Sequence, residues 1–363
     1  MLLLFIYLFS LVGSGGDLPK EYKECYTGAT VVSRDTLIAN DNIEVSSRLF
    51  ELIFGKGNSD GKDVMLYPGG SAFGLMIKED GVTVLGSSTC RALLAGDRIV
   101  MINGKEIDSA EDVEAALLAS GGKRLEIDVI RCGERLRISV TPRLVDGKYT
   151  LGVTLRSQTA GIGTVTFIDP ETNAFGGLGH GVSDASGGYI TVKEGAVCSV
   201  TLGGCKRGEV GHAGELTGVL KQTKLGTIDI NSECGVFGTL DTLPDYCDKP
   251  LPAAKRGEVK CGAAEIISTV KNGKRATYGI EIYDIDQNSH GSKSFKIKVT
   301  DPTLIAITGG IVRGMSGSPI IQDGKLVGAV THVMVANPTE GYGIFIENML
   351  NAATQNQVQP KAA

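Results

Sequence analysis

The chain has 363 residues, the length of two or three domains, and 42% of them are hydrophobic, so each domain can bury a core. A net charge of −5 with no basic stripe argues against nucleic-acid binding. No G-x-x-x-x-G-K-[ST] motif and no CxxC pair occurs, which excludes a P-loop nucleotide site and a zinc ribbon, and we expect no cofactor and no metal.

An unbroken apolar run, LLLFIYLFSLV, fills residues 2–12. A helix of that length spans only about half of a bilayer. Together with the small residues that follow, it favours a secretion signal or membrane anchor over residues 1–16, with a buried N-terminal strand as the alternative. We therefore expect export. The eight cysteines are then either disulfide partners of unassigned pairing or buried small hydrophobes.

Residues 17–60 are polar and mixed and predict no recognisable fold, whereas residues 61–143 have the pattern of one compact module. Within it, AGDRIVMINGKEI (95–107) predicts two strands joined by an Asn-Gly turn. A helix follows, because Ser109 and Asp112 form a capping-box-like start to an amphipathic stretch. RLEIDVIRCGERLRISVTP then predicts two alternating strands.

This order of elements, with GDRIVMINGKEI at its centre, resembles a PDZ domain. PDZ domains bind an extended peptide as an added strand and hold its carboxylate on backbone N–H groups of a glycine-containing loop. The resemblance implies that this loop lies at Ala72, Phe73, Gly74 and Leu75 and binds a C-terminal or internal peptide. The alternative is that these residues only begin the first strand.

Residues 150–350 form a glycine-rich β region that holds all four histidines, and residues 351–363 are expected to be a flexible tail. Two features there suggest hydrolysis through a serine: His180, flanked by glycines in GGLGHGVSD, and Ser316 in GIVRGMSGSPI. Such chemistry needs a hydroxyl nucleophile, an imidazole base, a carboxylate and backbone N–H groups for the oxyanion. The competing interpretation of the serine segment is a tight turn between two strands.

In GMSGSP the N–H groups of Gly314 and Ser316 are the candidate oxyanion donors. Ser318 is the poorer nucleophile because Pro319 after it has no N–H. The β-rich context and a histidine that precedes the serine resemble the chymotrypsin-like proteases. The expected fold class is therefore mainly β: a PDZ domain followed by a chymotrypsin-like double β-barrel.

Three longer strings, GIGTVTFIDPETNAFGGLGHGVSD, TGGIVRGMSGSPIIQDGKLVGAVTHV and GYGIFIENML, resemble the SpoIVB peptidase family of spore-forming bacteria. The resemblance implies a PDZ-containing serine endopeptidase exported into the space around the forespore. It implies cleavage of the protein itself and of a membrane-associated regulatory protein that restrains a membrane-embedded protease, so that a late sigma factor is activated.

The same resemblance assigns Ser316 as nucleophile, His180 as base and Asp301, in KVTDPTL, as the acid. Asp184, four residues after the histidine, is the rival acid, and its other expected role is an Asx turn. His332, on a predicted strand beside the cleft, either touches substrate or is an ordinary strand histidine. The alternative function is a catalytically inactive PDZ adaptor on a protease-like scaffold.

Overall fold

The computed structural model describes residues 64–184, 187–271 and 273–355. The segments expected as a signal or anchor (1–16) and as the N-terminal region (17–60) lie outside the described residues. Within the described part, no helix is both long and apolar enough to cross a membrane. Helix α5 (Ile346–Gln355) continues into the segment expected as a flexible tail, so residues 351–355 are helical.

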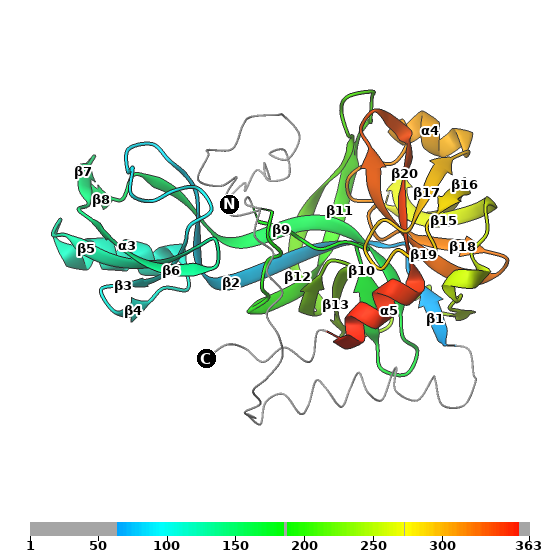
Figure 1. Cartoon of the computed structure of the whole chain (residues 1–363), viewed down its shortest axis with the longest axis horizontal. Helices are drawn as coiled ribbons and strands as arrows, with labels where there is room; N and C mark the ends of the chain where they lie inside the picture. Colours follow the sequence, from blue (N-terminus) through cyan, green and yellow to red (C-terminus); the bar gives the residue numbers. More distant parts are fainter. Residues whose placement is uncertain (1–63, 185–186, 272, 356–363) are drawn as a thin grey trace. The chain divides into compact units, whose positions relative to one another are not determined.

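The described residues are mainly β strands and divide into two compact units (Figure 1). The first unit contains residues 77–159 and 183–193, and the second contains residues 64–76, 160–182 and 194–355. Two long strands, β2 (Ala72–Ser87) and β9 (Val153–Ile168), belong partly to each unit. The chain therefore passes from the second unit into the first along β2 and returns to the second along β9.

The hairpin and the helix predicted for the first unit are both present. Asn103 and Gly104 have positive φ angles of 49° and 78° and join β3 to β4 in a two-residue turn. Ser109 caps helix α3, since its hydroxyl oxygen accepts the N–H of Asp112 at 3.2 Å. The bounds in this unit are β3 (Arg98–Ile102), β4 (Lys105–Glu106), α3 (Ala110–Ser120), β5 (Leu125–Arg131), β6 (Glu134–Val140), β7 (Arg143–Val145) and β8 (Lys148–Thr150).

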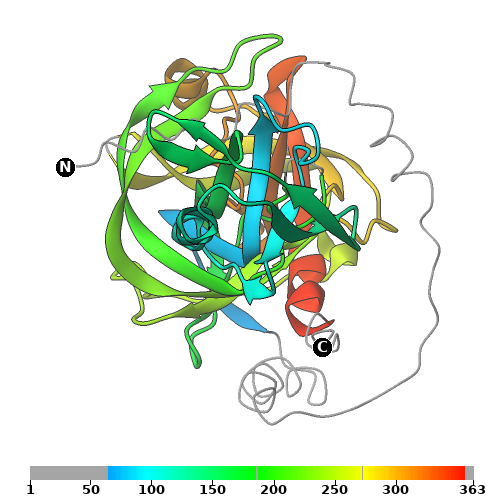
Figure 2. The same ribbon diagram turned by 90° about the vertical axis from the view of Figure 1, so that its left-hand side faces the viewer.

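A core of its own holds the first unit together. Val113 and Leu117 on the inner face of α3 pack with buried residues of the strands. Figure 2 shows the ribbon of this unit facing the viewer. The strand residues of this core include Val82, Ile99, Ile127 and Val129, and each of them is fully buried. The alternating pattern of the sequence therefore gives a separate module here, as expected.

Two rings of paired strands make up most of the second unit (Figure 1). Strands β15 to β20 close a six-stranded barrel in the order β15-β16-β17-β20-β19-β18. Strands β9, β10, β13, β12, β11 and β2 pair in that order, and a further pairing of β9 with β2 returns to the start. The predicted fold class, mainly β with a double β-barrel, is confirmed.

The bounds in the second unit follow chain order. They are β1 (Met65–Pro68), β10 (Ala174–Gly177), β11 (Glu194–Lys206), β12 (Glu215–Ser232), β13 (Gly235–Leu240), β14 (Leu251–Pro252), β15 (Gly262–Lys271), β16 (Lys274–Ile285), β17 (Phe295–Val299), α4 (Pro302–Thr308), β18 (Pro319–Gln322), β19 (Lys325–Met334) and β20 (Asn337–Phe345). A single 3₁₀ turn, η2 (Arg256–Glu258), precedes β15.

Residues 64–76 belong with the barrels because their pairing partners do. β1 pairs with β14 and with the last residues of β9, Phe167 and Ile168. The alternation of apolar residues predicts such strands but not the sheet that they join. The boundaries expected from sequence, 61–143 and 150–350, therefore differ from the two units at this point.

The residues of the expected carboxylate-binding loop lie in a strand, and peptide binding there stays a prediction. Ala72, Phe73, Gly74 and Leu75 lie inside β2 in the second unit, and Phe73 and Leu75 are buried. A Cβ atom added to Gly74 would lie 2.7 Å from the side chain of Leu220, so the glycine allows close packing within the barrel. These residues begin a strand, which was the alternative interpretation.

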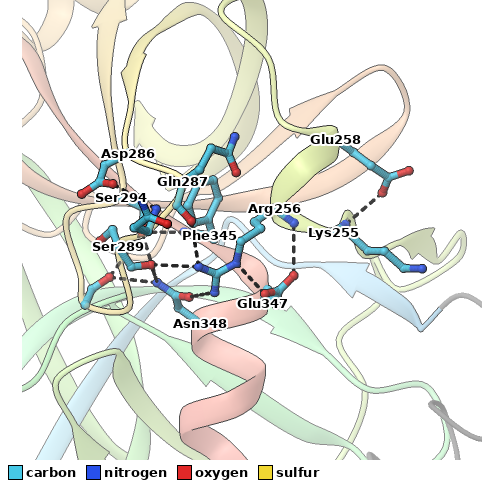
Figure 3. A network of polar contacts seen from close by, with 12 residues as sticks. Lys255, Arg256, Glu258, Asp286, Gln287, Ser289, Ser294, Phe345, Glu347 and Asn348 are labelled. Carbon is cyan, nitrogen blue, oxygen red and sulfur yellow. Dashed lines mark hydrogen bonds and ion pairs between the residues drawn. The ribbon is translucent and has the colours of Figure 1, made fainter.

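A polar network around Arg256 joins η2, α5 and the loop between β16 and β17 (Figure 3). The guanidinium donates to the carboxylate of Glu347 at 2.6 Å, to the amide oxygen of Asn348 at 2.9 Å and to the carbonyls of Gln287 and Ser289. Arg256 also stacks over the ring of Phe345 in the barrel wall. The network fixes a loop whose later residues contact the candidate site.

Candidate active site

The two serines of GIVRGMSGSPI differ in exposure. Ser316 is partly exposed in the turn before β18, whereas Ser318 is completely buried and its hydroxyl donates to the hydroxyl of Ser268 at 3.0 Å. A buried and hydrogen-bonded hydroxyl cannot reach a substrate carbonyl. Of the two, Ser316 alone has the access that a nucleophile needs.

Strand β9 holds the serine loop by three hydrogen bonds. The backbone N–H of Thr164 donates to the carbonyl of Ser316 at 2.9 Å, and the Thr164 hydroxyl donates to the carbonyl of Gly314 at 2.8 Å. The hydroxyl of Thr166 donates to the carbonyl of Gly317, also at 2.8 Å. Both threonines are fully buried, so the hydrogen bonds that hold the loop are shielded from water.

Glycine is required at two positions of the loop. Gly314 and Gly317 have φ angles of 96° and 93°, a region that other residues rarely adopt. A Cβ atom at Gly317 would also lie 2.0 Å from the carbonyl oxygen of Thr164. The glycines thus let the loop bend and let it lie directly on strand β9.

The two expected oxyanion donors are held in place through the carbonyls that precede them. The carbonyl before Gly314 accepts the N–H of Leu216 at 2.8 Å, and the carbonyl before Ser316 accepts the N–H of Ser318 at 2.9 Å. A trans peptide directs its N–H opposite to its C=O. The N–H groups of Gly314 and Ser316 therefore point away from these contacts, and neither donates to any residue in the described part of the chain.

His180 lies in a tightly shaped loop after β10. The amide of Asn231 on β12 makes two hydrogen bonds of 2.8 Å with the backbone of Val182, one in each direction, and so fixes the loop. Nδ1 of His180 lies 2.9 Å from the carbonyl oxygen of Gly181. A carbonyl only accepts, so Nδ1 carries the proton and Nε2 remains free to accept one. Burial lowers the pKa of His180, so the ring is neutral at pH 7 and able to act as a base.

Strand β19 contacts both the serine and the histidine. The hydroxyl of Ser316 donates to the carbonyl of Thr331 at 2.8 Å, and the ring of the next residue, His332, lies 4.8 Å from the ring of His180 between centroids. A Cβ atom at Gly179 would lie 2.9 Å from the Thr331 methyl group, so this glycine lets the histidine loop approach the strand. In this structure the Ser316 hydroxyl points at β19.

Asp301 has a structural contact. It is the N-cap of helix α4, where its carboxylate accepts the N–H of Leu304 at 2.9 Å, and Pro302 follows it at the first helical position. No carboxylate of the described residues forms a hydrogen bond to His180. The structure therefore shows Asp301 as a helix cap and does not show it in contact with the base.

Replacing Asp301 separates the capping role from an acid role. A cap needs only an oxygen acceptor, so Asp301→Asn is expected to keep both stability and most activity, while Asp301→Ala loses about 1 kcal/mol of unfolding free energy. Urea denaturation together with a peptidase assay measures both quantities. If Asp301→Asn folds normally but loses about 10⁴-fold in rate, the residue is the acid after all.

Asp184, the rival acid, belongs to the first unit. Its Oδ1 accepts the N–H of Gly188 at 3.0 Å, and its backbone N–H donates to the carbonyl of the same glycine. This is the turn-closing role that the sequence offered as its alternative. Among the described residues, no group of three or more His, Cys, Asp or Glu residues is placed to hold a metal ion.

Sequence analysis missed the residues that support the site. Thr164 and Thr166 alternate in GTVTF and so point to the same face of β9, and threonines that repeat on one buried face are a sequence signal of hydrogen bonding to a neighbouring segment. Asn231 and the Gly181 carbonyl carry no sequence signal, because their roles depend on which strands become neighbours.

Comparison with known proteins gives two family matches. A model described as SpoIVB peptidase S55 matches residues 147–350, which is more than half of the chain, and a PDZ domain model matches residues 85–131. Among curated proteins, the putative zinc metalloprotease LL2128 of Lactococcus lactis subsp. lactis (strain IL1403) is 35% identical over 83 residues. That stretch is 23% of this chain and only 18% of the relative.

Three solved structures are similar to parts of the chain. The PDZ domain of the SdrC-like protein Lmo2051 from Listeria monocytogenes has 23% identity and a TM-score of 0.20, and the match covers 22% of this chain and 90% of that one. The active form of the Rv3671c protease from M. tuberculosis has 13% identity and a TM-score of 0.34, covering 56% and 78%. The HtrA-type protease AlgW with a decapeptide has 10% identity and a TM-score of 0.34, covering 80% and 65%.

Proposed function

We propose a role in sporulation signalling for this chain on one premise: it belongs to the SpoIVB peptidase family and is a serine peptidase with a PDZ domain. In this role it is an exported endopeptidase, held at or near the membrane around the forespore. It cleaves itself and a membrane-associated regulatory protein. That cleavage frees a membrane-embedded protease and leads to activation of a late sigma factor.

The observation that carries the peptidase mechanism is the geometry of the serine loop. Ser316 is the accessible serine, and beside it the N–H groups of Gly314 and Ser316 donate to no residue in the part of the chain that the structure describes. In the proposed reaction the Ser316 Oγ attacks the substrate carbonyl carbon while its proton passes to Nε2 of His180. The two N–H groups then stabilise the oxyanion, and the imidazolium returns the proton to the leaving amine.

The proposed PDZ role is to select the protein or peptide that reaches the peptidase, with the chain's own N-terminal region as one such ligand. A PDZ domain binds an extended peptide by main-chain hydrogen bonds to a strand edge. The residues expected to hold its carboxylate, Ala72 to Leu75, lie in β2 in the other unit, where Phe73 and Leu75 are buried. We therefore propose that the peptide binds to a strand edge of the first unit.

Self-cleavage tests the proposal most directly. We expect the mass spectrum of the purified full-length chain, incubated alone, to show new fragments that increase with time. Their masses give the residue before each cut. Ser316→Ala protein incubated in parallel is expected to stay intact. A wild-type chain that remains whole for days and cleaves neither casein nor the co-expressed regulatory protein would contradict the proposal.

A specific observation favours the second candidate, an inactive PDZ adaptor. The Ser316 hydroxyl donates to Thr331 rather than to His180, and His180 has a carbonyl where serine peptidases commonly have a carboxylate. An adaptor would bind peptides and cleave none. Any wild-type cleavage that disappears in Ser316→Ala excludes it.

A further inference from the structure

His332 occupies a position that the proposed mechanism leaves unused. It follows Thr331 on β19, at a point where the pairing register with β20 shifts between Val330 and Val333. Thr331 is itself fixed, since its hydroxyl donates to the carbonyl of Ser292 at 2.8 Å, in the loop held by Arg256 and Asn348. This hydrogen bond therefore fixes the backbone next to His332.

The ring of His332 lies against the ring of His180. The centroids are 4.8 Å apart and the planes are inclined by 37°, which is the range of a tilted aromatic contact. A Cβ atom at Gly341 on β20 would lie 2.4 Å from the His332 carbonyl oxygen, so the backbone of β20 packs directly against that of β19 at this residue. The contact thus follows from the backbone arrangement of β19 and β20.

His332 is neutral and carries a polar atom with no partner. Its Nδ1 is buried and forms no hydrogen bond with any residue in the described ranges. Burial, followed by the repulsion that a protonated His332 would meet from protonated His180 and from Lys293, lowers the pKa of His332 to about 3. Among the residues that the structure describes, Lys293, from the loop before β17, is the one non-histidine charged group with such an effect on it. A buried polar atom without a partner destabilises a fold and is retained most often where the side chain has a function.

His180 needs a contact that restricts the tilt of its ring, and the neighbouring ring of His332 supplies one. The Gly181 carbonyl fixes which nitrogen carries the proton, but one hydrogen bond to an adjacent residue leaves the ring free to tilt. When Nε2 accepts the proton of Ser316, the ring becomes an imidazolium, and no carboxylate of the described residues forms a hydrogen bond to it. The face of a neutral aromatic ring attracts a cation and restricts the tilt of the ring beside it.

We infer that His332 is a positioning residue of the peptidase: its ring braces the His180 imidazole and supports the positive charge that forms there, in place of a contacting carboxylate. The inference rests on the proposed function, since it presupposes that Ser316 and His180 react. It assigns the role to the aromatic face of His332 and not to its nitrogens.

The matched pair His332→Leu and His332→Phe tests this assignment. Leucine fills the site without an aromatic face, and phenylalanine restores the face without a nitrogen. The readout is the rate at which a fluorophosphonate probe labels Ser316 between pH 4 and pH 9, since labelling needs the activated hydroxyl and little of the substrate pocket. We expect His332→Leu to slow labelling about tenfold and to move its acid limb, which reports His180, to lower pH, and His332→Phe to restore both.

Each other outcome has a definite meaning. The inference is wrong if His332→Leu, His332→Phe and the wild type are labelled at equal rates and have the same acid limb in the pH profile. Equal losses in both variants also overturn it, because they show that a nitrogen of His332 is needed. A change confined to the KM of a peptide substrate makes His332 a substrate contact instead. If thermal unfolding of His332→Leu is not cooperative, that variant is not properly folded, and His332→Met is used in its place. Failure of the wild type to label at all contradicts the proposed function and not this inference alone.

Discussion

Ser316→Ala is expected to abolish labelling by a fluorophosphonate and to lower the peptidase rate by at least about 10³-fold. The hydroxyl is the only nucleophile that the loop exposes, because Ser318 is fully buried against Ser268. The variant should fold normally. The lost hydrogen bond to the Thr331 carbonyl is at a partly exposed site, where it contributes about 1 kcal/mol.

Ser318→Ala is the matched control, two residues away in the same loop. It leaves Ser268 without its partner and should cost about 1 kcal/mol of stability, while labelling of Ser316 continues. The double variant Ser268→Ala with Ser318→Ala removes both hydroxyls and should recover part of that loss. Labelling that survives in Ser316→Ala and disappears in Ser318→Ala would reverse the assignment of the nucleophile.

Gly317→Ala is expected to destabilise the protein by about 3 kcal/mol or more and to remove activity with it. Two effects add at this position. Alanine is strained at a φ of 93°, and its methyl group would lie 2.0 Å from the Thr164 carbonyl oxygen. The loop can relieve that overlap only by leaving strand β9, which breaks the hydrogen bonds that hold it.

Gly324→Ala separates the two effects. Gly324 also has a positive φ, of 75°, but an added Cβ atom there would meet nothing within 4 Å. Its cost should be the backbone strain alone, about 1 kcal/mol, with full activity. Chemical denaturation of both variants gives the difference. Equal losses for the two would mean that the loop adapts easily and that Gly317 is not needed for close packing.

The candidate nucleophile and the double barrel could be predicted because each has a local signal. Alternating apolar residues with glycine turns give antiparallel strands whichever sheet they join. Pro319 after Ser318 already argued for Ser316, and burial of Ser318 agrees with that choice. What a strand pairs with depends on distant segments, so the segment from Ala72 to Leu75 was expected in the wrong unit.

His180 shows the same difference between features with a local sequence signal and contacts that depend on distant segments. The flanking glycines marked the residue as special, but its contacts come from β12, β19 and the adjacent carbonyl. The acid expected by resemblance, Asp301, precedes a proline, which is also the pattern of a helix start. A residue type at a given spacing cannot distinguish a cap from a catalytic carboxylate, because both roles need an oxygen that accepts a hydrogen bond.

The passage of the chain through β2 and β9 has a consequence for the products of any cut. A break anywhere between residues 77 and 159 severs the chain, yet β1 and the start of β2 stay hydrogen-bonded to β14, β9 and β11 in the second unit. The two polypeptides then remain one native particle and separate only in denaturant. Whichever peptidase makes such a cut, the strands before it stay paired with the barrels, so an intact chain is not required for an assembled molecule.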